Sequence, residues 1–253
     1  MHRTSQIQVV HPVSEPPLGL SVLGIDLGAF FLAVREIGPD PALVLLTARA
    51  LALRNRTASS FQSLGWMLGM PRAKVLRSLR RLSDAGAIVW HDEADRGVIA
   101  VEVMSDLPGD RPLFGPDDVP PFSTHALPTH WFVQALPLVG RRAFLAYLYL
   151  RSRERRDGLT PPLLVAALVR ACRLRWDWQG RLLLARLRRR GLVAPVGGSR
   201  FAVLDPRPPS RRQRRYLRLL ELGLLPPTVA GRLALAAAIF VPLALIALAL
   251  SLL

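Results

Sequence analysis

The segment from 61 to 86 constrains the fold more than any other, because it predicts two helices joined by a very short turn. Gly69 and Pro71 separate an apolar stretch from a second, amphipathic stretch that ends at Gly86. Glycine adopts the positive φ that ends a helix, and proline is tolerated at the first position of the next helix. In the second helix, aliphatic residues recur at helical spacing and predict one buried face. They are Val75, Leu79 and Leu82.

The basic residues of this second helix fall in its first turn or on the opposite face, since each residue turns the helix by about 100°. They are Arg72, Lys74, Arg77, Arg80 and Arg81. A helix that enters the major groove of DNA needs this division, with apolar residues on the domain and long donors facing outward. The pattern therefore predicts a DNA-binding helix. A solvated basic helix in a protein-binding module is the alternative.

Two β-rich runs around a polar turn follow at 88–103, and a helix is predicted before the pair at 41–54. This order, with the motif from Leu68 to Gly86, resembles the winged helix-turn-helix superfamily over residues 41–104. The resemblance implies DNA binding by Arg72, Lys74, Arg77 and Arg81. It also implies that the hairpin, whose turn contains Arg96, lies near a phosphate or the minor groove.

A second basic block, at 131–204, predicts a divergent copy of the first. We expect helices at 141–153, at 161–171 with Thr160 as its cap, and at 177–190, followed by a small hairpin. Aligning Gly86 with Gly191 places Leu79 on Leu184 and Leu82 on Leu187. The candidate DNA-binding residues here are Arg181, Arg188 and Arg189.

Three other features of this block have simpler interpretations. The run 182–184 is all leucine, so one leucine must face outward. Trp176 and Trp178 are expected in the core, although stacking on nucleic-acid bases is the alternative. Cys172, the only cysteine, is expected to be a small buried residue.

Charge is distributed in blocks along the 253 residues, whose net charge is +16 and pI about 11.6. The second block alone is +12, which favours a polyanionic partner. Residues 1–40 are expected to form an N-terminal segment, and the proline-rich, acidic stretch 105–130 a linker in which no strand or helix persists. A single cysteine excludes a disulfide scaffold and a zinc finger, and no catalytic motif is visible, so we expect no cofactor, no metal and no enzyme.

The last 21 residues, 233–253, contain no charge and are long enough to cross a bilayer as a helix. The preceding segment, 205–232, is basic, which predicts that this side stays in the cytoplasm and contacts anionic lipids. The residues expected at the membrane surface are Arg211, Arg212, Arg214, Arg215 and Arg218. A buried core helix is the alternative for 233–253.

The sequence thus predicts an α+β, mainly α protein with two tandem winged helix-turn-helix domains and a C-terminal transmembrane helix. We expect a transcription regulator that binds double-stranded DNA at the cytoplasmic face of the cell membrane, single-pass with its N-terminus in the cytoplasm. A plasmid replication initiator and a protein-binding adaptor at the membrane are the alternatives. A homodimer would suit paired DNA half-sites, although two modules in one chain can replace it.

Overall fold

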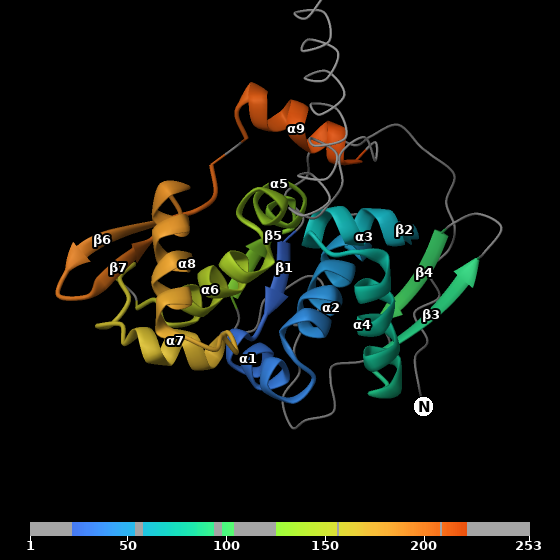
Figure 1. Ribbon diagram of the computed structural model, residues 1–253, viewed down its shortest axis with the longest axis horizontal. Helices are drawn as coiled ribbons and strands as arrows, with labels where there is room; N and C mark the ends of the chain where they lie inside the picture. Colours follow the sequence, from blue (N-terminus) through green and yellow to red (C-terminus); the bar gives the residue numbers. More distant parts are fainter. Residues whose placement is uncertain are drawn as a thin grey trace, which may run out of the picture.

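The computed structural model describes residues 22–53, 58–93, 98–103, 125–155, 157–207 and 209–221. Within them the protein is α+β and mainly helical, with small antiparallel sheets, which confirms the coarse fold class (Figure 1). None of the helices in these ranges is long and apolar enough to cross a bilayer. The span predicted at 233–253 lies outside the described residues.

The first repeat, residues 22–103, contains two helices, a helical pair and a three-stranded sheet. Its elements are β1 (Val22–Ile25), α1 (Leu27–Glu36), α2 (Pro39–Ala52), β2 (Ala58–Ser60), α3 (Phe61–Leu68), α4 (Arg72–Asp84), β3 (Ile88–Glu93) and β4 (Val98–Val103). The sheet has the order β2-β4-β3, so the strand before the helical pair joins the hairpin after it. Gly69 and Gly86 take positive φ of 60° and 70° and end α3 and α4, as the sequence predicts.

The second repeat, residues 125–203, has the same order. Its elements are β5 (His125–Pro128), α5 (His130–Val139), α6 (Arg141–Ser152), α7 (Val165–Ala171), α8 (Asp177–Arg189), β6 (Val193–Gly197) and β7 (Arg200–Val203). Leu159 bridges Ala202 of β7 and so occupies the place of β2. Helix α9 (Arg211–Glu221) follows and packs against α3 and α5.

The two repeats are joined as a pseudo-two-fold pair. Their first strands pair antiparallel, with Val22 opposite Pro128 and Ile25 opposite His125, and two equivalent strands that pair antiparallel are exchanged by a two-fold axis. The helices obey the same relation, because α3 packs against α5 while α7 packs against α1. Figure 1 shows β1 and β5 side by side between the repeats. The two repeats within this one chain are therefore related to each other as the two subunits of a symmetric dimer are.

One hydrophobic core runs through both repeats. At its centre, α6 is buried from Ala143 to Leu150, so its sequence shows no polar face. Edge-to-face aromatic pairs connect α6 to α5, with ring centroids 5.4 Å apart for Phe132 and Phe144 and 5.8 Å for Trp131 and Tyr147. The two repeats therefore form a single folded body.

Two boundaries predicted from the sequence are wrong. Residues 22–40 do not form a separate N-terminal segment, because they supply β1, α1 and the start of α2 to the core. The predicted linker 105–130 ends too late, since 125–128 is a strand and His130 begins α5. Proline at position 128 is compatible with this strand because it stands at the strand's end.

The predicted start of the helix at 161–171 is also wrong. Helix α7 begins at Val165, and Thr160 does not cap it. Instead, the Thr160 hydroxyl accepts a hydrogen bond from the Phe201 amide (3.0 Å), and the Thr160 amide donates to the Phe201 carbonyl (2.8 Å). Residues 161–164 have no helical structure. Thr160 is thus used to hold the extended segment beside β7.

Candidate nucleic-acid interface

Helix α4 has the two faces that the sequence predicts. Val75, Leu79 and Leu82 are fully buried and fix the helix to the core of the first repeat. The side chains on the other face are exposed, namely Arg72, Arg77, Arg80 and Arg81. The guanidinium groups are therefore presented by a helix whose position is set by aliphatic packing.

Lys74 is placed differently from the other basic residues of α4. Its Nζ lies 2.7 Å from Asp40 Oδ2, and the same carboxylate accepts a hydrogen bond from Arg141 Nε at 3.0 Å. Burial acts to raise the pKa of Asp40, but the hydrogen bond from Lys74 and the charge of Arg141 outweigh it and leave the pKa below its ordinary value. Lys74 is thus engaged within the chain, whereas the sequence predicted it as a free DNA contact.

The structure describes the strands of the hairpin that follows α4, but not its turn. β3 and β4 pair antiparallel, from Ile88 opposite Val103 to Glu93 opposite Val98. Arg96, the predicted wing contact, lies outside the described residues.

Helix α8, the counterpart of α4, exposes Arg181, Arg188 and Arg189 as expected. The expectation that Trp176 and Trp178 lie in the core is wrong, because they are 50% and 57% exposed. Gly180 marks the buried face of α8, and two helical residues turn by about 200°. Trp178 and Leu182, each two residues from Gly180, therefore lie on the outer face. Leu182 is the outward leucine that the sequence requires, at 58% exposure.

Gly180 determines how closely α8 approaches α7. A Cβ at this position would lie 2.9 Å from Val169 Cγ2 and 3.0 Å from Val165 Cγ1, so only glycine fits without a shift. The aligned residue in α4 is the buried Val75. The second repeat thus has glycine between its paired helices at a position where the first repeat has a buried valine.

One arginine from each repeat approaches Gly38, the residue that precedes α2. Nη1 of Arg81 and Nη1 of Arg173 lie 3.8 and 4.0 Å from the point where a Cβ on Gly38 would stand. Arg173 Nη1 also donates to the Arg35 carbonyl at 3.4 Å. The turn before α8 therefore brings the guanidinium group of Arg173 near that of Arg81 on α4.

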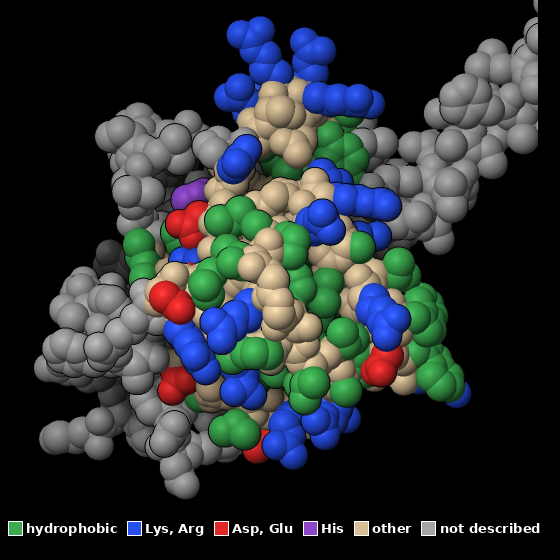
Figure 2. All heavy atoms as spheres, turned by 90° about the vertical axis from the view of Figure 1, so that its left-hand side faces the viewer, with side chains coloured by type: hydrophobic (Ala, Val, Ile, Leu, Met, Phe, Trp, Pro, Cys, Tyr) green, Lys and Arg blue, Asp and Glu red, His purple; other side chains and the backbone are tan. Residues whose placement is uncertain are grey.

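Arginines are also prominent on the face that contains α7, α8 and the β6–β7 hairpin. Figure 2 shows Lys and Arg side chains interleaved with hydrophobic ones over this face, with fewer acidic side chains. The arginines of α9 are exposed, while Tyr216 and Leu217 pack against the core. The exposed residues of α9 are Arg211, Arg212, Arg214, Arg215 and Arg218, which the sequence assigns to the membrane surface.

Sequence reasoning missed several arginines that gather on the second repeat. Arg142, Arg173, Arg175, Arg186 and Arg190 line one hollow beside α8 together with Trp178. They come from α6, from the turn before α8 and from the end of α8, so no local pattern groups them. The signal in the sequence for this site was the spacing of Trp178 and Gly180. Two residues apart on a helix, they lie on opposite faces, so a glycine on the buried face places the tryptophan on the exposed face.

In comparisons with protein-family models, with curated proteins and with solved structures, no match to this chain is found.

Proposed function

We propose that the protein binds double-stranded DNA through winged helix-turn-helix modules, with α4 as the recognition helix of the first module. The observation on which this depends is the division of α4 into a buried aliphatic face and an exposed arginine face. A helix that reads the major groove requires both faces.

The arrangement around α4 supports this assignment. The order of α2, β2, α3, α4, β3 and β4, with the sheet order β2-β4-β3, is the order that a winged helix-turn-helix requires. The turn between α3 and α4 is three residues long and contains Gly69. The second repeat has the same element order, with Leu159 in the place of β2.

The pseudo-two-fold arrangement suits a monomer that performs the task of a dimer. Many DNA-binding proteins present two recognition helices to two half-sites by pairing identical subunits. Here the β1–β5 pair relates the two repeats within one chain. Transcription regulation is the role we propose for such a protein, and replication initiation is the alternative role for the same DNA-binding unit.

A tether to the cytoplasmic face of the membrane stays a prediction from the sequence. Its helix, 233–253, lies outside the described residues. The exposed arginines of α9 are compatible with binding anionic lipids. Because they lie away from α4, substitutions among them also provide a control for the DNA-binding experiment below.

The test is the affinity of the full chain for a fluorescent random-sequence duplex, measured by anisotropy over a range of salt concentrations. Arg77→Ala combined with Arg81→Ala should weaken binding by about tenfold or more. If both contact phosphate, the slope of log affinity against log salt should fall by about 0.9 for each lost contact. Both side chains are exposed, so the variant should fold.

The matched control removes two exposed arginines from α9, with Arg214→Ala and Arg215→Ala. It changes the net charge of the protein equally but leaves α4 intact. If the control weakens duplex binding as much as the α4 variant, the attraction is general and α4 has no special role. If the α4 variant keeps full DNA affinity and instead loses a protein partner, the adaptor function is correct.

A further inference from the structure

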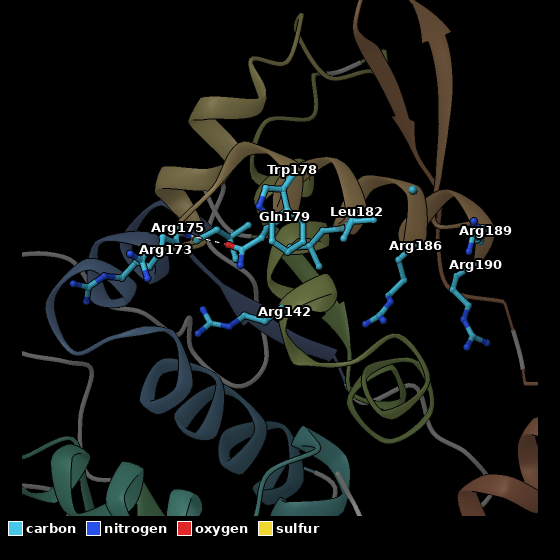
Figure 3. Close-up of a pocket in the computed structure, with 12 residues that line it drawn as sticks. Arg142, Arg173, Arg175, Trp178, Gln179, Leu182, Arg186, Arg189 and Arg190 are labelled. Carbon is cyan, nitrogen blue, oxygen red and sulfur yellow. Dashed lines mark hydrogen bonds between the residues drawn. The ribbon is translucent and has the colours of Figure 1, made fainter. Parts of the chain in front are cut away.

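A groove of about 700 Å³ runs along α8, and we refer to it as the α8 groove. It extends from the turn before α8 to the end of that helix, and part of its wall comes from the start of α6 (Figure 3). The arginines that line it are Arg142, Arg173, Arg175, Arg186, Arg189 and Arg190. No aspartate or glutamate is among the described residues that line it. The groove is therefore built for an anionic ligand.

Most of the arginines lie at the two ends of the groove, while Arg142 and Gln179 lie between the ends together with apolar side chains. In Figure 3, Arg173 and Arg175 stand at one end and Arg186, Arg189 and Arg190 at the other. Trp178 and Leu182 lie between them, and both are more than half exposed. An exposed tryptophan between two groups of guanidinium side chains can stack on a flat ring whose phosphates reach the ends.

The walls of the groove are held by contacts within the chain. Arg142 Nη1 donates to the Cys172 carbonyl at 3.1 Å. Gln179 Oε1 accepts from the amides of Arg175 (3.0 Å) and Trp176 (3.3 Å), which fixes the turn before α8. Arg175 lies over the ring of Trp176, with its Cζ 5.0 Å from the ring centroid. These contacts prepare the groove before a ligand arrives.

The outer face of α8 differs from that of α4 in a way that disfavours the same ligand. When Gly86 is aligned with Gly191, Arg72, Arg77 and Arg80 of α4 correspond to three residues without positive charge. These are Asp177, Leu182 and Ala185. The middle of α8 has thus lost the donors that read base edges in a duplex, while its aromatic and apolar side chains suit unpaired bases.

We propose that the α8 groove binds a short stretch of single-stranded nucleic acid, with a base stacked on Trp178 and phosphates on the guanidinium groups at the two ends. The proposal goes beyond duplex binding by α4 and does not require it, since the groove lies in the other repeat. An acidic peptide would satisfy the charges, but it would leave the exposed ring of Trp178 without a flat partner.

The test is the affinity of the full chain for a labelled twelve-nucleotide oligothymidine, measured by anisotropy at low salt. Trp178→Ala should weaken binding by about 5- to 150-fold, the range expected for the loss of one stacked base. Trp178→Phe keeps a ring that can stack and should restore most of the affinity. Trp178 is exposed, so both variants should fold, which circular dichroism can verify.

The matched control is Leu164→Ala, which truncates another exposed apolar side chain that does not line the groove. It should leave oligothymidine binding unchanged, and Arg77→Ala with Arg81→Ala should affect the duplex more than the single strand. Absence of binding, equal affinity of the wild type and Trp178→Ala, or equal loss in Trp178→Ala and Trp178→Phe would overturn the proposal. Displacement by oligoglutamate as effective as by unlabelled oligothymidine would instead assign the groove to an acidic peptide.

Discussion

Replacing Asp40 by asparagine should destabilise the protein, because one carboxylate joins three helices. Asp40 stands in the first turn of α2 and contacts Lys74 of α4 and Arg141 of α6. Arg141 in turn donates from Nη1 to the Gly69 carbonyl at 3.0 Å, so it also holds the turn before α4. Asparagine keeps the shape of the side chain and removes its charge.

The size of the effect follows from the exposure of the three partners. The side chains of Asp40, Arg141 and Lys74 are 14%, 25% and 36% exposed. Breaking a fully buried pair costs about 3–5 kcal/mol, whereas an exposed pair contributes about 0–1 kcal/mol. The charge at the start of α2 adds about 0.3–1 kcal/mol through the helix dipole. Because these groups lie between the two limits, we expect the free energy of unfolding to fall by roughly 1.5–3 kcal/mol.

Urea denaturation at two pH values measures this effect. The pKa of Asp40 is lowered in the folded state, so its stabilisation is present above its ordinary pKa and is lost as the pH falls through the lowered value. Wild type and Asp40→Asn should therefore differ near neutral pH and converge in strong acid. Asp84→Asn removes an exposed carboxylate from α4 and is the control, with an expected change within about 0.5 kcal/mol.

Asp40→Asn should have the opposite effect on DNA binding. The substitution releases Lys74 and removes a negative charge beside α4, so duplex affinity should rise while stability falls. If the unfolding free energy of Asp40→Asn stays within about 0.5 kcal/mol of wild type at neutral pH, the three-helix contact does not matter for stability, and the reasoning fails.

Two further predictions concern packing and pH. Gly180→Ala should lower the free energy of unfolding, measured by urea denaturation, by about 1 kcal/mol. Overpacking against Val165 and Val169 costs about 1–3 kcal/mol and outweighs the ~1 kcal/mol gain in helix propensity. A stabilised variant would show that α7 and α8 lie further apart. Burial and the charge of Arg151 lower the pKa of His125 in the folded state. The contribution of this histidine to the free energy of unfolding should therefore be complete above its ordinary pKa of 6.5 and be lost as the pH falls through the lowered value. Denaturation between mildly alkaline and mildly acid pH should show this decline in the wild type, and His125→Leu should reduce it.

Helix α4 could be predicted because everything that defines it is local. Its buried stripe repeats at helical spacing, and the residues that end α3 and α4, Gly69 and Gly86, take the positive φ that their type permits. The exposed arginines follow from the same periodicity, since a stripe fixed on one side leaves the other side to solvent. What the periodicity does not show is that Asp40, more than thirty residues earlier, binds Lys74.

The β1–β5 pair could not be predicted, because neither strand identifies its partner. Each has only four residues, and His125 pairs with Ile25 across a hundred positions of sequence. The proline-rich composition before β5 suggested a linker, and no helix was predicted at 130–139, where α5 forms and includes Pro137. Helix α6 has no polar face because both repeats cover it, so its sequence alone does not reveal that it occupies the centre.

The contrast between α4 and α8 supports the proposal that two repeats with the same element order bind different ligands. The stability of each repeat depends on the inner face of its last helix, α4 or α8, where Leu82 and Leu187 occupy aligned, fully buried positions. The outer face contributes little to folding, so it can exchange arginine for leucine, as at Arg77 and Leu182, and alanine for tryptophan, as at Ala73 and Trp178, without loss of the fold. Gly180 shows that even the inner face changed, since it lets α7 approach α8 closely.

An outer face with exposed apolar rings is costly to leave in water, and in the second repeat that exposure is combined with six arginines and no carboxylate along the α8 groove. A solvated structural helix gains nothing from either feature, whereas a surface that stacks bases and neutralises phosphates needs both.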